Sequence, residues 1–310
     1  MAYFLALDAG GTKTTGVLAD EKRVLARASC GTVKLMRVGE AEATARLLGL
    51  LDEISIAAGV PLSEVSRTCM GLAGLSIAAV REWAEKRLGE SVGGELELCG
   101  DEEIALDAAF RGGPGILVIA GTGSNFVGRV VVDAGGDTDI VAKYWVGGWG
   151  PILGDEGAGY WIGVEAVKAG LWGRDRGVPT RLLDEIQEFW GLESLGELVE
   201  KGNGEPRADF AELAPLVARC AREGDELAAA VLDRAGQELA EQVVLVHLKM
   251  MEAGDIGEVG VAYTGSVLEH IDAVREAMVA ALKESAPRLK VMEGAVDSLE
   301  GALWRARNGG

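Results

Sequence analysis

Two short apolar runs, each followed by a turn rich in small residues, constrain the fold of this chain more than any other feature. The first run, residues 4–7, leads through Asp8 into Gly10, Gly11, Thr12 and Lys13. The second, residues 116–119, leads into Gly121, Thr122, Gly123 and Ser124. A buried strand that ends in such a turn exposes backbone N–H groups and hydroxyls, which suit an anion such as phosphate. The repeated pattern predicts two similar halves, each offering one phosphate-holding turn to a shared cleft.

Length and charge limit the possible partners. A chain of 310 residues is long enough for two domains. No apolar run approaches the ~20 residues that span a bilayer, and the first residues lack a basic region leading into a cleavable apolar segment. We therefore expect a cytoplasmic protein with no membrane partner. The net charge of −19 argues against a nucleic-acid partner, which needs a basic surface, but permits a small phosphate ligand.

The order of elements in the first half is that of an RNase H-like domain. Apolar and polar patterning predicts strands over 3–7, 14–19, 24–28, 67–71 and 96–99, and helices over 39–58, 77–88 and 104–110. This βββαβα order predicts an α/β fold with a mixed sheet and helices packed on it.

Two aspartates follow strands in this half. Asp8 ends the first strand, where a carboxylate can hold a hydrated Mg²⁺ beside phosphates, or can simply cap a turn. Asp101 lies where a strand ends and a helix begins, so it can accept a proton from a sugar hydroxyl as a general base. Asp101 can equally serve as an N-cap of the helix. The residues alone leave both alternatives open for each aspartate. We expect Asp107, inside the helix, to be solvated or structural.

The stretch 147–163 contains seven glycines in seventeen residues, a conformational cost that a purely structural loop does not need. Its aromatic residues and its Asp155-Glu156 pair suit a sugar pocket, in which an aromatic face contacts the ring and carboxylates bind hydroxyls. Gly148, Trp149 and Asp155 are its candidate contacts.

The remainder of the second half is mainly helical. We expect a hairpin of strands 127–132 and 140–146 around residues 133–137, helices over 164–171, 180–189, 210–223 and 226–252, a linker turn over 201–206, a strand over 259–263, a strand over 289–292 and a helix over 298–307. The inserted helices can form a homodimer face or pack within the domain. Gly265 and Ser266 follow the 259–263 strand, and a Ser-capped helix start is the structural interpretation of that turn.

The four cysteines lie far apart in the sequence without a C-x-x-C pair, so neither a zinc site nor a disulfide framework follows. We expect them to be small buried hydrophobic residues. The two histidines, His247 and His270, lie in helical segments, and we assign both to packing or to the surface.

The motifs LDAGGTKT, AGTGSN, GDEEIAL and GGWGPILGDEGAGYWIG together resemble the BadF/BadG/BcrA/BcrD ATPase family, most closely its N-acetylglucosamine kinase branch. The resemblance implies an actin/hexokinase/Hsp70-type fold, in which two RNase H-like ATPase domains, residues 1–115 and 116–310 with a helical insertion, close over ATP and Mg²⁺. It further implies an ATP-dependent kinase for a hydroxyl of N-acetylglucosamine or glucosamine, and we expect a homodimer.

The resemblance also assigns roles to particular residues. It implies that Asp101 is the catalytic base and that Asp8 holds Mg²⁺ through water. It places the phosphates at Gly10, Gly11, Thr12, Lys13, Gly121, Thr122, Gly123 and Ser124. It places the sugar at Gly148, Trp149 and Asp155, with Asp101 and Thr122 nearby, and the adenosine at Gly265 and Ser266.

The chain departs from the family pattern in one loop. Many sugar kinases of this family have Ser-Asn or Thr-Asn there, where the Asn contacts the sugar, but residues 31–37 contain no Asn. A Lys or Arg of this loop can serve other hydroxyls or an acidic sugar. A kinase for a different hexose, an ATPase that activates a dehydratase or reductase through an iron–sulfur cluster, and a sugar sensor that binds without turnover are the alternative functions.

Overall fold

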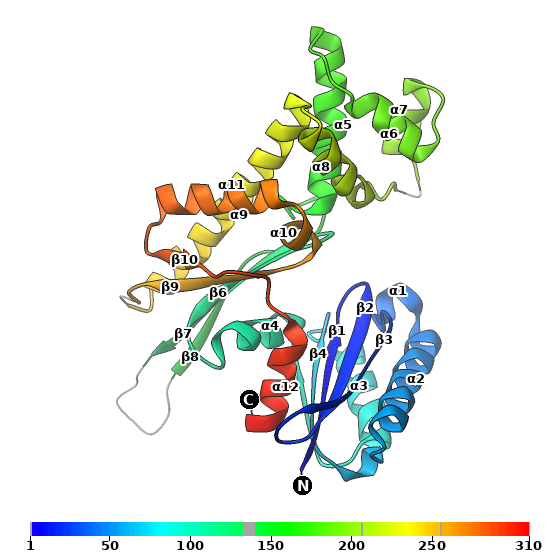
Figure 1. Cartoon of the computed structure of the whole chain (residues 1–310), viewed down its shortest axis with the longest axis vertical. Coiled ribbons are helices and arrows are strands. Elements are labelled where there is room, and N and C mark those ends of the chain that lie inside the picture. The colour runs from blue at the N-terminus through cyan, green and yellow to red at the C-terminus, as the bar shows by residue number, and fades with distance from the viewer. Residues whose placement is uncertain (1, 133–139, 206, 255, 310) are drawn as a thin grey trace. The chain divides into compact units, whose positions relative to one another are not determined.

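The computed structural model describes residues 2–132, 140–205, 207–254 and 256–309, and its chain divides into two compact units (Figure 1). Unit 1 comprises Met1–Gly113 and Val296–Gly310, and unit 2 comprises Pro114–Ala295. The division near residue 114 lies close to the predicted boundary. The predicted second domain, 116–310, differs from unit 2 because residues 296–310 pack with unit 1. The turn expected over 133–137 lies outside the described residues.

Unit 1 is built on a five-stranded mixed sheet. Its strands are β1 (Tyr3–Ala9), β2 (Lys13–Ala19), β3 (Val24–Gly31), β4 (Val65–Leu72) and β5 (Glu95–Cys99). The spatial order is β3-β2-β1-β4-β5. β1 pairs antiparallel with β2 and parallel with β4, and β5 continues the parallel side. Because β1, β4 and β5 are parallel, their carboxyl ends bring Asp8 and Asp101 to the same edge of the sheet.

Helices cover both faces of this sheet. They are α1 (Leu35–Val38), α2 (Glu40–Ala58), α3 (Ala78–Ser91), α4 (Asp101–Phe110) and α12 (Ser298–Asn308), with a 3₁₀ turn at Leu62–Glu64. Leu5 and Leu7 face a core shared with α2 and α3, whereas Ala6 between them faces α4 and α12. This alternation is the period of two expected for a strand between two helical layers. Figure 1 shows α4 and α12 on the face of the sheet opposite α2.

Close packing and a buried ion-pair cluster hold α12 in unit 1. A Cβ added to Gly301 would lie 1.8 Å from the backbone oxygen of Ile104 in α4, so α12 approaches α4 as closely as glycine allows. Arg305 of α12 donates hydrogen bonds to the carboxylates of Asp107, Glu97 and Glu103. Asp107 is only 1% exposed, so it is structural and not solvated.

Unit 2 repeats the same sheet topology. Its strands are β6 (Gly115–Ala120), β7 (Ser124–Val132), β8 (Ile140–Gly147), β9 (Val259–Thr264) and β10 (Leu289–Val291). Their order is β10-β9-β6-β7-β8, with three antiparallel strands followed on the other side by two parallel ones. Two mixed α/β halves with one topology confirm the predicted fold class.

The helices of unit 2 are more numerous than those of unit 1. They are α5 (Gly159–Arg176), α6 (Leu182–Trp190), α7 (Leu195–Asn203), α8 (Ala214–Arg222), α9 (Glu226–Met251), α10 (Ser266–His270) and α11 (Asp272–Ser285), with a 3₁₀ turn at Phe210–Leu213. Helix α9 packs against α11 and against β7 and β8. Sequence patterning did not predict α1, α7 or α11, and α7 extends into the expected linker. Among the described helices, none has the length and apolar character needed to cross a membrane.

Candidate functional site

The first glycine turn joins β1 to β2 and is fixed through its carbonyl oxygens. Thr32 donates from Oγ1 to the oxygen of Gly10 at 2.9 Å and from its backbone N–H to the oxygen of Thr12 at 3.1 Å. Arg37 donates from Nη1 to the oxygen of Gly11 at 3.0 Å. Gly11, Thr12 and the following lysine are exposed. The turn is therefore rigidly held from one side while its residues remain accessible to a ligand.

Asp8 and Asp101 lie at the same edge of the unit 1 sheet, and the charge of Asp8 acts on Asp101. Burial raises the pKa of Asp8 to about 6, Asp297 adds to this by charge repulsion, and Lys13 opposes it. Burial likewise raises the pKa of Asp101, and the charge of Asp8 contributes to that rise. Crowded carboxylates favour a bound cation, and oxygen donors are the ligands that Mg²⁺ prefers. The donor set around Asp8 therefore fits Mg²⁺.

Asp101 begins α4, and Gly100 is the N-cap of that helix without any side-chain cap bond. The capping alternative for Asp101 is therefore wrong. Its carboxyl group instead forms a hydrogen bond with Glu102, which lowers the pKa of Asp101 and raises that of Glu102. Despite this hydrogen bond, the surroundings raise the pKa of both carboxyl groups above its ordinary value. Burial is the main reason that the pKa of Glu102 rises to about 7.

The second glycine turn is fixed in a similar way within unit 2. The carbonyl oxygens of Gly121 and Thr122 accept hydrogen bonds from the N–H groups of Gly159 (2.8 Å) and Tyr160 (3.1 Å), the first residues of α5. Ser124 Oγ donates to the oxygen of Glu156 at 3.1 Å. The glycine-rich stretch 147–163 therefore binds directly to the predicted phosphate turn through its C-terminal part.

Asp155 is the most constrained residue of that stretch. It has φ 60°, a conformation uncommon for residues other than glycine, and is 7% exposed. Its Oδ1 accepts from the N–H of Gly150 at 3.3 Å, and a Cβ added to Gly123 would lie 2.4 Å from its Oδ2. Burial raises the pKa of Asp155, and backbone hydrogen bonds from Gly150 and Ser124 oppose that rise. Strain held beside a glycine turn is typical of a functional position.

The other predicted sugar contacts lie in the exposed part of the loop. Trp149 is 74% exposed, and Ile152 and Leu153 beside it are also exposed. Gly148 has φ 73° and approaches the Asn125 side chain, because an added Cβ would lie 3.2 Å from Asn125 Oδ1. An exposed indole on a glycine-rich loop is available to stack against a ligand.

Gly265 and Ser266 lie against the second glycine turn. Gly265 has φ 102°, and an added Cβ would lie 2.4 Å from the backbone oxygen of Ala120. An added Cβ on Gly121 would in turn lie 3.8 Å from Ser266 Oγ. Gly265 is the N-cap of α10 and forms no side-chain cap bond, so Ser266 does not cap that helix. Within unit 2 the structure thus brings the predicted phosphate and adenosine contacts together.

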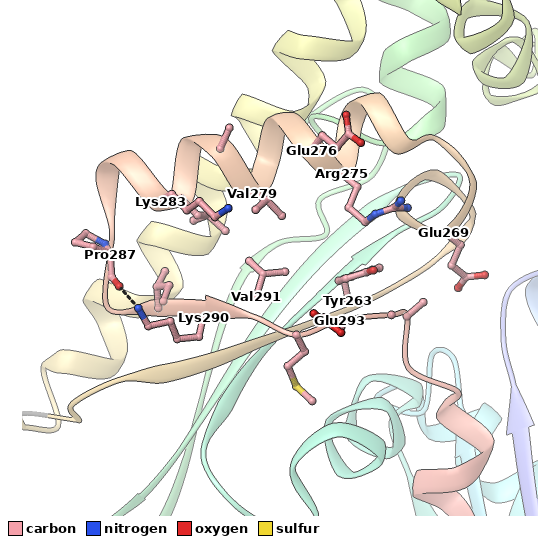
Figure 2. A pocket seen from close by; sticks show the side chains of 16 residues that line it. Tyr263, Glu269, Arg275, Glu276, Val279, Lys283, Pro287, Lys290, Val291 and Glu293 are labelled. Atoms are coloured by element: carbon pink, nitrogen blue, oxygen red, sulfur yellow. Dashed lines mark hydrogen bonds between the residues drawn. The ribbon is translucent and has the colours of Figure 1, made fainter.

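A cavity of about 1120 Å³ lies beneath α11 and is lined mainly by residues of α11, β9 and β10. Figure 2 shows Arg275, Val279 and Lys283 on α11, with Tyr263 and Val291 on the strands below. Glu269 also lines the cavity, and its Oε1 accepts a hydrogen bond from the N–H of Gly265 at 2.8 Å. Because basic and acidic side chains both line the wall, the cavity does not select for an anion in the way the glycine turns do.

Sequence reasoning missed four contributors to the candidate site. Glu102, Asp297, Thr32 and Arg37 were not assigned, although the acidic run Asp101-Glu102-Glu103 at a helix start was a visible signal.

The cysteines also differ in part from expectation. Cys69, Cys99 and Cys220 are buried as expected, whereas Cys30 is only half-buried.

Comparison with known proteins agrees with the fold and the motifs. The N-acetylmuramic acid/N-acetylglucosamine kinase of Clostridium acetobutylicum is 30% identical over 99% of both chains. The N-acetyl-D-glucosamine kinase of Dictyostelium discoideum is 26% identical over 98% of both. A solved structure from Chromobacterium violaceum, described as an N-acetylglucosamine kinase, superposes with a TM-score of 0.73 at 29% identity over 99% of both chains. Residues 5–303 match the BadF/BadG/BcrA/BcrD ATPase family, and the chain belongs to that family.

Proposed function

We propose that this chain is an ATP-dependent kinase that phosphorylates a hydroxyl of N-acetylglucosamine or of a related amino sugar such as glucosamine. The observation that carries the proposal is the position of the Asp101 carboxylate at the start of α4, at the same edge of the unit 1 sheet as Asp8. The two curated relatives, both sugar kinases that match almost the whole chain, support the same reaction class.

Asp101 acts as the general base in this proposal. It accepts the proton of the sugar hydroxyl while that oxygen forms a bond to the γ-phosphorus, and the bond between the γ-phosphorus and the β,γ-bridging oxygen breaks to release ADP. The N-terminus of α4 favours the anionic form of Asp101, because the helix dipole places partial positive charge there. Glu102, the next residue of α4, lies beside this carboxylate and forms a hydrogen bond with it.

The glycine turns supply the phosphate contacts. Gly10, Gly11, Thr12 and Lys13 of unit 1, and Gly121, Thr122, Gly123 and Ser124 of unit 2, offer N–H groups, hydroxyls and one ammonium group to the triphosphate. Gly265 and Ser266 contact the adenosine. Bound Mg²⁺ would neutralise charge on the phosphates, and Asp8 would hold it through water.

The sugar contacts are Gly148, Trp149 and Asp155, with Thr122 and Asp101 nearby. Trp149 stacks on the sugar ring, and Asp155 accepts hydrogen bonds from its hydroxyls. The loop over 31–37 lacks the Asn that many family members use, and its Arg37 is hydrogen-bonded to the first glycine turn. Lys34, the other cationic residue of this loop, can therefore contact the carboxylate of an acidic sugar.

A coupled assay of ADP release tests the proposal. The sugars compared are glucosamine, N-acetylglucosamine, glucose, N-acetylmannosamine and N-acetylmuramic acid, each with ATP and Mg²⁺. We expect the highest kcat/KM with an amino sugar. ADP release that does not depend on any added sugar would contradict the proposal, and binding of sugar and ATP without ADP release would indicate a sensor.

An ATPase that activates a dehydratase needs several thiolates at an exposed surface to hold an iron–sulfur cluster. Of the four cysteines, only Cys30 has appreciable exposure, which disfavours this alternative. Visible charge-transfer absorbance of the purified protein would favour it.

A homodimer is also part of the proposal, and light scattering coupled to size-exclusion chromatography tests it.

A further inference from the structure

Two cysteines that are 30 positions apart in the sequence meet inside unit 1. Cys69 of β4 and Cys99 of β5 place their Sγ atoms 3.9 Å apart, and both residues are buried. Glu97 lies two residues before Cys99 on the same face of β5 and directly opposite Cys69 in the strand register. One carboxylate oxygen of Glu97 and the two sulfurs lie within 4.8 Å of one another.

We propose that Cys69, Cys99 and Glu97 form a binding site for a thiophilic divalent cation such as Zn²⁺ or Cd²⁺. Two Zn–S bonds of about 2.3 Å at a tetrahedral angle separate the sulfurs by ~3.8 Å, close to the separation seen here. Two thiolates and one carboxylate make a donor set that Zn²⁺ accepts, and water would complete the tetrahedron. The Glu97 side chain is 25% exposed, so this side of the site is accessible to solvent.

The strand geometry favours a bridging cation over a disulfide. Cys99 lies opposite Gly71, two positions along from Cys69, so the two cysteines are diagonal neighbours. Parallel strands lie ~4.8 Å apart and rise ~3.3 Å per residue, so Cα atoms two positions out of register are ~8 Å apart, beyond the ~7 Å limit for a disulfide.

The charges around the pair are compatible with a cation. Arg305 Nη1 donates a hydrogen bond to Glu97 Oε1 at 2.5 Å, so a bound cation would share the Glu97 carboxylate with this guanidinium. The carboxylates of Glu103 and Asp107 also face Arg305 and offset its charge. Binding converts two thiols and one carboxylate into two metal thiolates and one metal carboxylate, and releases two protons to solvent. Because the incoming charge equals the charge of the two protons that leave, the net charge of the cluster stays the same.

Titration with Cd²⁺ tests the proposal, with the cadmium–thiolate charge-transfer band in the ultraviolet as the readout. We expect one Cd²⁺ per chain, with an apparent affinity that rises roughly 100-fold per pH unit because two protons leave. The Cys69→Ser and Cys99→Ser variants should lose the band. Glu97→Gln should retain it with an affinity at least ~10-fold lower.

Cys220→Ser and Cys30→Ser are the matched controls, since neither cysteine lies in the cluster. Both should bind Cd²⁺ as the unmodified chain does, and circular dichroism checks that every variant is folded. A Cd²⁺ band of the same intensity in the Cys69→Ser/Cys99→Ser double variant would overturn the proposal. Absence of any band in the unmodified, fully reduced protein would overturn it as well.

Discussion

Gly123 allows the carboxylate of Asp155 to approach the second glycine turn, because any side chain at position 123 would occupy the space of that carboxylate. An ideal Cβ there would lie 2.4 Å from Oδ2 and 3.0 Å from Cγ of Asp155. Asp155 itself is buried in a left-handed conformation and has little freedom to move away. The close approach of Asp155 to Gly123 joins the predicted sugar contact to the predicted phosphate turn within unit 2.

We expect Gly123→Ala to displace Asp155 and to lower kcat/KM for the sugar by roughly 10²-fold, since small misplacements of a positioning group have effects of that size. Steady-state kinetics at saturating ATP measures this. Gly49→Ala is the control, because Gly49 is an exposed position in α2 with nothing within 4 Å of its Cβ. That variant should keep full activity and gain about 1 kcal/mol of stability from helix propensity. If Gly123→Ala and Gly49→Ala have the same kcat/KM for the sugar, Gly123 does not position Asp155 for the reaction.

Asp101→Asn removes the proton acceptor while preserving size and polarity. We expect turnover to fall at least ~10²-fold, with the affinity for Mg²⁺-ATP measured by calorimetry essentially unchanged. Asp52→Asn, at an exposed position in α2, should have no effect on either quantity. Because burial raises the pKa of Asp101, the acidic limb of the kcat profile should lie above the usual range for an aspartate. Unchanged turnover in Asp101→Asn would reject the base assignment.

Glu102 should make the stability of unit 1 depend on pH. Its pKa is raised from 4.5 to about 7 in the folded chain, so its favourable contribution is present below pH 4.5 and is lost as the pH rises through 7. Gln is neutral at every pH and does not lose this contribution. The Tm of Glu102→Gln minus the Tm of the unmodified protein should therefore be larger at pH 8 than at pH 5. Each 1 kcal/mol corresponds to a shift of about 2–4 °C in domains of 150–250 residues. Glu85→Gln, on the exposed face of α3, should show no such trend. A Tm difference for Glu102→Gln that stays constant with pH would contradict the raised pKa of Glu102.

Local patterns were sufficient to predict most of the sheet and the glycine turns. The apolar runs of β1 and β6 and the glycine turns after them are visible in the sequence because each depends on neighbouring residues. The spacing of Val274, Met278 and Leu282, the buried residues of α11, also indicates a helix. In contrast, nothing local to Arg305 indicates that α12 packs on α4. That placement depends on partners about 200 residues away, as does the pairing of Arg305 with Asp107.

The Arg305 cluster gives a stability prediction for unit 1. Arg305→Met should leave the buried carboxylate of Asp107 without its guanidinium partner, and removing one partner of a buried ion pair typically costs about 3–5 kcal/mol. Thermal unfolding should report a correspondingly lower Tm. Arg81→Met breaks an exposed pair with Glu85 at 3.9 Å and should change stability by less than about 1 kcal/mol. Similar Tm values for the two variants would show that the cluster does not anchor α12.

Gly265→Ala tests the adenosine contact. The residue combines φ 102° with a space that backbone atoms of Ala120 fill, so a methyl group there must move either the turn or the end of β6. We expect KM for ATP to rise at least ~10-fold, since a misplaced contact group loses its interaction, while KM for the sugar changes little. Gly177→Ala is the matched control, because Gly177 has φ 69° but nothing within 4 Å of its Cβ. Gly177→Ala should lose about 1 kcal/mol of stability because of its positive φ, and its KM for ATP should stay unchanged. If both variants keep the original KM for ATP, Gly265 does not contact the nucleotide.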